Sequence, residues 1–324
     1  MIVSGIDEAG YGPLLGPLVV GCCAFEVDVD GLSPGEIPCL WKRLRRCLSR
    51  NRLRTGRRIH VNDSKLVYTP ATGLKELERS VLCLACAAES WSDDLSSLLD
   101  RVAPGACEEA AAYAWYRPPD REPFPIEQEA TPIRLFANAL RQEMRRTTVR
   151  CIHLRAQLVF ERRFNNMLAA TRNKATALFS IAATHLDYLL RTYGRSNLVI
   201  ICDRQGGREH YGSLLRLMFP QWALKIESEK DGNSEYRLCQ GPDVVRIFFR
   251  EKAEADCLPV AVASMLSKYL REAMMRRFNA FWKHHLPGVA PTAGYYGDGL
   301  RFLTDIDAKR RELGITDEQL VRSR

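Results

Sequence analysis

The chain has 324 residues, of which 46 % are hydrophobic, and this is typical of a globular protein with a packed core. Its 47 Lys and Arg residues exceed its 39 Asp and Glu residues, and the net charge of +8 suits a nucleic-acid partner, although many other soluble proteins share it. No stretch approaches the roughly 20 apolar residues of a membrane helix, and the first residues resemble no secretory signal. We therefore expect a soluble, cytoplasmic, monomeric protein with no membrane partner.

The cysteines are interpreted as reduced core residues. Five of the eleven, Cys22, Cys23, Cys83, Cys86 and Cys202, lie in apolar runs, where a thiol behaves as a small hydrophobic side chain. Cys83 and Cys86 have the spacing of half a zinc site, but a second pair is missing from the sequence, which favours core packing. The six histidines show no HExxH or other metal-binding spacing.

In chain order, the first predicted elements are two strands, at residues 1–10 and 14–27, which we expect to form a hairpin. Two insertions on the core follow, at about 30–60 and 92–150. The first contains a half-basic run, 41–58, with nine cations in eighteen residues, which is either a solvated surface or a phosphate-binding segment. The second mixes acids, prolines and arginines without a stable period.

A helix followed by a strand is predicted next. Apolar residues recur three or four apart over 164–193, which indicates an amphipathic helix. Residues 197–202 are rich in Val, Ile and Leu and predict a buried strand with Asp203 at its carboxyl end. A further strand is expected at 244–249 and a long helix at 261–283. This alternation indicates an α/β fold.

Acidic residues follow two of these strands. Asp7 and Glu8 come after the first strand, and Asp203 comes after the strand that the helix feeds. If the strands are neighbours, three carboxylates converge, and Glu254 or Asp256 could complete an oxygen-rich site for Mg²⁺ or Mn²⁺. Paired ions in such a site activate a water for phosphodiester cleavage. Acids at strand ends are also commonly solvated loop residues, so the pattern alone leaves both interpretations open.

The sequence around the first acidic pair resembles the signature of type 2 ribonucleases H. Residues 5–13, GIDEAGYGP, followed by 15–19, LGPLV, match that signature, in which the Asp-Glu pair supplies two metal-site acids. Further blocks follow in the order of the family: DSK at 63–65, the helix and strand leading into Asp203, KAE at 252–254, and AVASMLSK at 261–268. The resemblance covers most of the chain and leaves the two insertions outside it.

The resemblance implies a ribonuclease H-like fold over residues 1–324, with a mixed central β-sheet flanked by helices and a helical C-terminal part from about residue 261. It implies an endonuclease that binds RNA/DNA hybrids or RNA-DNA junction duplexes. Such an enzyme hydrolyses the RNA strand to 3′-hydroxyl and 5′-phosphate ends by a two-metal mechanism with Mg²⁺ or Mn²⁺. Two alternatives stay open: a nuclease of this fold that acts on another structure, such as branched DNA, and a non-catalytic nucleic-acid-binding relative.

The catalytic and metal-binding residues implied by the resemblance are Asp7, Glu8, Asp203 and Glu254. Glu254 is chosen because the fourth acid of the family stands ten residues before the Ser of the helix motif, here Ser264; Asp256 is its competitor. The KAE stretch resembles the ribonuclease HIII branch, whereas the first motif resembles the HII branch. Because the first strand begins at residue 2, we expect the additional N-terminal DNA-binding domain of HIII members to be absent.

The resemblance also implies substrate contacts. The backbone of Gly10 and Gly12 can approach a ribose 2′-hydroxyl closely, Lys65 and Lys268 match lysines near the phosphates, and Tyr295 resembles a Tyr that packs on the sugar beside the scissile junction.

Three departures from the family concern junction recognition more than cleavage. Tyr11 stands between the two glycines where the HII branch has Arg. Arg204 follows Asp203 where that branch has Gly. The His that follows the C-terminal Gly-Tyr is missing. We therefore include Tyr11 among the expected substrate-binding residues, as a position at which this chain differs from the HII branch.

Overall fold

The computed structural model describes residues 1–33, 35–53, 56–230 and 232–323. Within these ranges one sheet of seven strands has the order β5-β2-β1-β6-β9-β8-β7. The strands of this sheet are β1 (Ile2–Ala9), β2 (Leu18–Val27), β5 (Val149–Val159), β6 (Leu198–Asp203), β7 (Ala223–Lys230), β8 (Asn233–Gln240) and β9 (Asp243–Arg250). β1, β6 and β9 are parallel, and the other neighbours are antiparallel. The expected α/β class with a mixed central sheet is confirmed.

The predicted hairpin forms the centre of the sheet. β1 and β2 pair antiparallel from Ile2 opposite Glu26 to Ala9 opposite Val19. This ladder keeps the backbone extended through Asp7 and Glu8, so these acids belong to the end of β1 and do not follow it.

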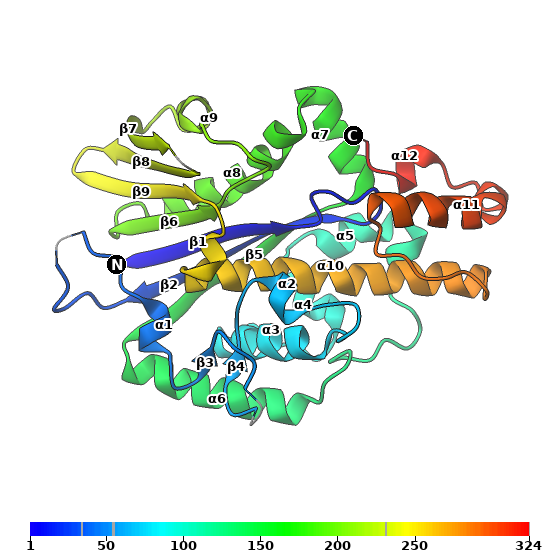
Figure 1. Ribbon diagram of the computed structural model, residues 1–324, viewed down its shortest axis with the longest axis horizontal. Coiled ribbons are helices and arrows are strands. Elements are labelled where there is room, and N and C mark those ends of the chain that lie inside the picture. Colours follow the sequence, from blue (N-terminus) through cyan, green and yellow to red (C-terminus); the bar gives the residue numbers. More distant parts are fainter. Residues whose placement is uncertain (34, 54–55, 231, 324) are drawn as a thin grey trace.

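Helices cover both faces of the sheet (Figure 1). α10 (Leu258–His285) lies along one face, against β1 and β2, and α8 (Lys174–Tyr193) lies along the other. Two glycines allow α10 its close approach: a Cβ on Gly5 would lie 2.2 Å from the backbone N of Val260, and one on Gly21 would lie 2.5 Å from Oγ of Ser267. The helix that carries the C-terminal motif is therefore in direct contact with the backbone of the strand that carries the first acids.

The remaining elements surround these layers. Beside α10 lie α1 (Leu40–Arg43), β3 (Leu48–Ser49), β4 (Ile59–His60), α2 (Ser64–Val67), α3 (Lys75–Ala87), α4 (Leu95–Val102), α5 (Ala106–Ala111), η1 (Ala114–Tyr116) and α6 (Ala130–Arg146). On the α8 side lie α7 (Glu161–Thr171) and α9 (Gly212–Met218). After β9 come η2 (Ala253–Ala255), α10, and the C-terminal helices α11 (Tyr296–Glu312) and α12 (Asp317–Leu320).

Two expectations about secondary structure were wrong. The segment 164–193 is not one helix. α7 ends at Thr171 and is followed by Arg172, which has a positive φ of 50°. α8 begins after Asn173, whose side chain accepts a hydrogen bond from Thr176 N at 2.9 Å. The second predicted insertion does contain a periodic element. α6 buries residues spaced three and four apart, namely Ile133, Ala137, Leu140 and Met144.

The first predicted insertion is anchored by buried side chains, including Trp41, Leu44 and Leu48. Pro34, Arg54 and Thr55 of this insertion lie outside the described residues, and Arg54 belongs to the basic run 41–58. The interpretation of both segments as insertions stays a prediction.

The expectation for the cysteines is confirmed. All eleven are free thiols, and the five in apolar runs are buried. Cys83 and Cys86 lie together on α3 inside the core. Among the helices that the structure describes, none combines the length and apolar character needed to cross a membrane.

Candidate active site

The sheet brings Asp7 next to Asp203. β1 and β6 are parallel neighbours, and their register places Ile6 opposite Cys202, so the residues that follow both lie at the carboxyl ends of the two strands. Glu8 is the next residue on β1. The three carboxylates that the sequence placed at strand ends therefore share one edge of the sheet, the usual position of ligand sites in such folds.

Glu254 joins them from the third parallel strand. β9 pairs with β6 up to Arg250 opposite Asp203, and the chain then turns into η2, which carries Glu254. This turn is tied to the site because Ala253 N donates a hydrogen bond to Oδ1 of Asp203 at 3.1 Å. Glu254 is buried beside Asp203, and a hydrogen bond between the two side chains contributes to raising the pKa of Glu254.

Burial and mutual repulsion make the charged form of this centre unfavourable. Burial is the largest cause that raises the pKa of all four acids, to about 8 for Glu8 and about 7 for Glu254. The neighbouring charge of Asp203 raises the pKa of Asp7, Glu8 and Glu254 further. Oε2 of Glu8 and Oε2 of Glu254 are buried without a hydrogen-bond partner. An all-oxygen set of this kind, with unpaired buried oxygens, fits a hard cation such as Mg²⁺ or Mn²⁺.

Serines of α10 connect the strand to the DSK segment. Oγ of Ser267 donates to the backbone oxygen of Asp7 at 3.1 Å, and the hydroxyls of Ser264 and Ser64 share a hydrogen bond of 3.1 Å. A hydrogen bond from Ser264 also lowers the pKa of the Asp7 carboxyl, against the larger effect of burial. The sequence blocks around 7, 64 and 264 thus meet in space.

The two lysines named from the sequence have different surroundings. Lys65 is exposed, and its charge lowers the pKa of Glu8 and Asp203, which places it beside the acids. Lys268 is largely buried and donates to Oε1 of Glu272 at 2.5 Å, with its ammonium 4.6 Å from the ring centre of Tyr68. The charge of Lys268 is therefore already paired within the protein.

Gly10 and Gly12 lie in the turn between β1 and β2. Gly10 has a φ of 86°, and a Cβ there would lie 2.5 Å from Nε of Arg271 and 2.7 Å from the carbonyl oxygen of Pro17, so this position requires glycine. A Cβ on Gly12 would have no neighbour within 4 Å. The backbone at Gly12 is thus open to close approach by a ligand.

Tyr11 packs against residues that the sequence did not single out. Lys174 of α8 lies over its ring at 5.1 Å from the centre, and a Cβ on Gly206 would lie 3.1 Å from its hydroxyl. Burial and the charge of Glu8 raise the pKa of Tyr11, whereas Arg208 lowers it. Tyr11 is uncharged, but Lys174 and Arg208 supply positive charge around it.

Tyr295 lies beside the same turn. Its side chain is 51 % exposed, and Cζ of Arg271 lies 5.7 Å from its ring centre. The carbonyl oxygen of Gly294 accepts hydrogen bonds from the backbone N of Leu14 at 2.7 Å and of Leu15 at 3.1 Å. The segment before α11 is thereby fixed to the turn that carries Gly10, Tyr11 and Gly12.

Comparison with known proteins gives matches among solved structures alone: no family model and no curated protein matches the sequence. Ribonuclease HII of Archaeoglobus fulgidus, solved in complex with PCNA, is 15 % identical over 100 % of this chain and 95 % of its own, with a TM-score of 0.45. Ribonuclease H2 of Pyrococcus horikoshii is 14 % identical over 99 % and 92 %, with a TM-score of 0.43. Bst-RNase HIII, solved in complex with Mn²⁺, is 14 % identical over 99 % and 66 %, with a TM-score of 0.41. These structures belong to the family that the sequence motifs resemble.

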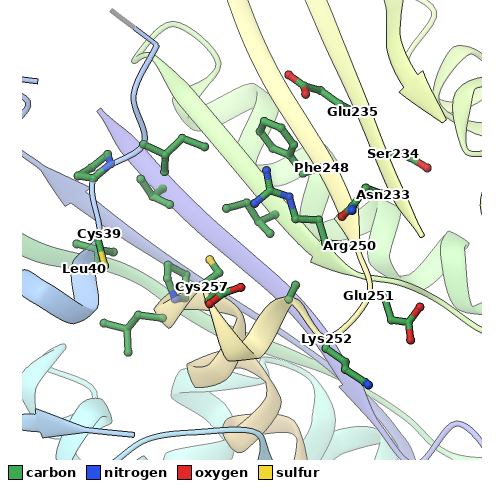
Figure 2. Close-up of a pocket in the computed structure, with 18 of the residues that line it drawn as sticks. Cys39, Leu40, Asn233, Ser234, Glu235, Phe248, Arg250, Glu251, Lys252 and Cys257 are labelled. Atoms are coloured by element: carbon green, nitrogen blue, oxygen red, sulfur yellow. The ribbon is translucent and has the colours of Figure 1, made fainter. Parts of the chain in front are cut away.

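The side chains of Asp256 and Arg204 have ion-pair partners outside the group of four acids. Asp256 is exposed, stands 3.8 Å from Arg50, and lines a cavity of about 620 Å³ between the end of β9 and the start of α10, whose described lining includes none of the four acids (Figure 2). Arg204 forms an ion pair with Glu251 at 3.0 Å. Burial therefore favours Glu254 over Asp256 as the fourth acid.

Arg322 is a further residue of this region that sequence reasoning missed. It is buried, and its guanidinium donates hydrogen bonds to the carbonyl oxygens of Gly10, of Tyr11 at 3.0 Å and of Gly16 at 3.4 Å. Glu161 supports the same turn by accepting from Gly16 N at 3.2 Å. Arg322 belongs to no motif and follows a short helix near the end of the chain, so the sequence offered no signal for it.

Proposed function

We propose that this chain is a divalent-metal-dependent ribonuclease H that hydrolyses the RNA strand of RNA/DNA hybrids. The observation that carries the proposal is the convergence of Asp7, Glu8, Asp203 and Glu254 from β1, β6 and η2 at one sheet edge. The surrounding motifs follow the same order as in type 2 ribonucleases H, and this resemblance supports hydrolysis of an RNA strand as the reaction of the acidic cluster. A cluster of acids alone would not identify one.

In this proposal the four carboxylates hold Mg²⁺ or Mn²⁺. Buried acids with raised pKa values and unpaired oxygens are costly without a cation, and the strand ends fix their positions. Bound there, the ions supply the Lewis acidity that phosphodiester hydrolysis requires. Ser264 and Ser267 orient Asp7 from α10, and Ala253 N orients Asp203.

Substrate binding is assigned to the surface around the acids. Lys65 is exposed beside Glu8 and Asp203 and would contact a phosphate next to the scissile bond. The open backbone at Gly12 would sense the 2′-hydroxyl, and the exposed ring of Tyr295 would pack on a sugar. Lys268 is expected to contribute less than Lys65, because its charge is neutralised by Glu272.

A cleavage assay tests this function. The full chain is incubated with Mg²⁺ or Mn²⁺ and with four duplexes: an RNA/DNA hybrid, DNA with a single ribonucleotide, all-DNA and all-RNA. We expect cleavage of the RNA strand of the hybrid, products with 3′-hydroxyl and 5′-phosphate ends, and loss of activity in Asp7→Asn. Equal cleavage of the all-DNA duplex would indicate a nuclease of another specificity. Absence of both cleavage and metal binding would indicate a non-catalytic binding protein.

A further inference from the structure

A second group of side chains that can bind a metal lies in the layer between the sheet and α8 and includes none of the four acids. Cys22, His153 and His185 are all buried, and each offers one ligand atom such that these atoms lie within 4.8 Å of one another. The residues come from β2, β5 and α8 and are separated by up to 163 positions in the sequence. Their assembly is a product of the fold, since the sequence has no metal-binding spacing.

The register of the sheet explains why they meet. β2 and β5 pair antiparallel with Ala24 opposite His153, and Cys22 lies two residues from Ala24, on the same face of β2. That face is covered by α8, and Nε2 of His185 lies 3.0 Å from the carbonyl oxygen of Val20. All three side chains therefore point into the layer between the sheet and α8.

The hydrogen bonds leave lone pairs for a ligand. A carbonyl oxygen can only accept, so Nε2 of His185 donates to Val20 and Nδ1 carries the free lone pair. Metal-binding histidines usually donate their other ring N–H to a group such as a backbone carbonyl oxygen, which fixes the orientation of the ring. Nε2 of His153 is buried without any hydrogen-bond partner, in a side chain that is 8 % exposed. A buried unpaired nitrogen costs free energy that a metal bond would offset.

Charge and donor type select the ion. Unprotonated imidazoles and a thiolate are the forms in which these side chains coordinate a metal. One thiol and two imidazoles form a soft donor set that suits Zn²⁺ or Cu⁺ and disfavours Mg²⁺ or Mn²⁺. One of the three residues borders a cavity: His153 lines a space of about 400 Å³ together with Tyr188, and their rings stack at 4.5 Å.

We infer that Cys22, His153 and His185 form a binding site for a thiophilic d¹⁰ cation, Zn²⁺ or Cu⁺, distinct from the acidic centre. On binding, the Cys22 thiol loses its proton to solvent, and bonds form from the metal to Sγ and to one nitrogen of each histidine. No electron is transferred. The site joins β2, β5 and α8, so its occupancy stabilises the sheet beside β1 without taking part in hydrolysis.

Metal titration of the reduced, metal-free chain tests the site. We expect one equivalent of Zn²⁺ or Cu⁺ to bind and to raise Tm, with separate titrations of the two ions deciding between them. Co²⁺ serves as the spectroscopic probe, because a thiolate ligand produces a sulfur-to-cobalt charge-transfer absorption. Cys22→Ser should remove this absorption, whereas Cys83→Ser, which changes a buried thiol on α3, should retain it.

His153→Phe is the second test, because an aromatic ring can keep the stacking on Tyr188 while it removes the ligand. It should weaken binding by more than the roughly 10 to 100-fold that loss of an outer-shell partner costs. Asp7→Asn should leave binding unchanged, which separates this site from the proposed nuclease centre. Absent thiolate absorption in the unmodified chain, absorption that persists in Cys22→Ser, or unchanged affinity in folded His153→Phe would each overturn the inference.

Discussion

The guanidinium of Arg322 donates a hydrogen bond from Nη1 to the carbonyl oxygen of Gly10, 312 residues earlier in the chain. Nη2 donates to the next carbonyl, that of Tyr11. Arg322 thus holds the turn that follows the first two acids. Its guanidinium also lies 4.2 Å from the ring centre of Phe164, so the C-terminal segment, the turn and α7 are fixed together.

Arg322→Met should therefore destabilise the fold and weaken substrate binding. Hydrogen bonds to charged groups contribute about 1.5 to 3 kcal/mol each, but partial relaxation of the turn makes a loss of about 2 kcal/mol our expectation. KM for a hybrid should rise more than kcat falls, because the turn is the proposed substrate contact and the acids stay in place. Arg311→Met, at an arginine that is 76 % exposed, is the matched control. An unchanged KM in folded Arg322→Met would contradict this positioning role.

Glu254 and Asp256 should differ sharply in activity. Glu254 is buried beside Asp203, whereas Asp256 is 91 % exposed and stands near Arg50. Glu254→Gln should remove most hybrid cleavage, and Asp256→Asn should leave most of it. Calorimetry with Mn²⁺ should show the same ranking for metal affinity. The reverse ranking in both measurements would exclude Glu254 as the fourth acid.

The stability of the metal-free protein should fall as pH rises from about 6.5 to about 8. Burial raises the pKa of Glu254 to about 7 and of Glu8 to about 8, from 4.5 for both, so the folded state binds more protons than the unfolded state within this window. Linkage then requires the contribution of these two acids to the free energy of unfolding to decrease from about pH 4.5 to about pH 8. The lowered pKa values of the buried His153 and His185 give an opposing contribution that increases up to about pH 6.5, so the net decrease is expected between about pH 6.5 and pH 8.

Thermal unfolding in EDTA and in Mg²⁺ at several pH values measures this effect. Mg²⁺ should raise Tm more near the upper end of the window than near its lower end, because the carboxylates are then ionised. Glu8→Gln should raise Tm in EDTA at the upper end and should reduce the slope. A Tm in EDTA that rises between about pH 6.5 and pH 8 would show that these acids are not held at raised pKa values.

The basic run 41–58 should contribute phosphate contacts that are independent of sequence. Six of its described cations are exposed; Arg50 and Arg52 form ion pairs with Asp256 and Glu76, which leaves Lys42, Arg45, Arg46 and Arg57 for replacement. Replacing these four with Gln should weaken binding to all duplexes alike and reduce the slope of log affinity against log salt by about one for each lost contact. The control replaces Arg191 and Arg195, which precede β6 at the end opposite Asp203. An equal slope in the variant and the unmodified chain would identify the run as solvated surface.

Cleavage of RNA/DNA hybrids should exceed cleavage at a single embedded ribonucleotide. Tyr11 has no charge where the HII branch has Arg, so it lacks a charge-assisted phosphate contact of about 1.5 to 3 kcal/mol. Lys174, over its ring, replaces part of that charge. Tyr11→Arg should raise kcat/KM on the single ribonucleotide by about tenfold, and Leu217→Arg, at an exposed position on α9, should not. Preference of the unmodified chain for the single ribonucleotide would contradict this expectation.

The local sequence pattern was sufficient to predict the central strands and the long C-terminal helix. Alternating or continuous apolar runs predicted β1, β2, β6 and β9, and α10 extends the predicted 261–283 by a few residues at each end. The break at Arg172 was missed because apolar spacing continues across it, and α6 was missed because charged residues obscure its four buried positions. Patterns of this kind report interactions within about four residues of one another.

The sequence by itself predicted the four acids: Asp7, Glu8 and Asp203 from their positions at strand ends, and Glu254 from a motif spacing that resembles the family. The tertiary structure alone decided which side chains surround them. The contact of Arg322 with Gly10, the position of Lys174 over Tyr11 and the grouping of Cys22, His153 and His185 depend on strand order and helix placement. Such contacts join residues far apart in the chain, so no local pattern encodes them, and only the packed sheet brings them within bonding distance.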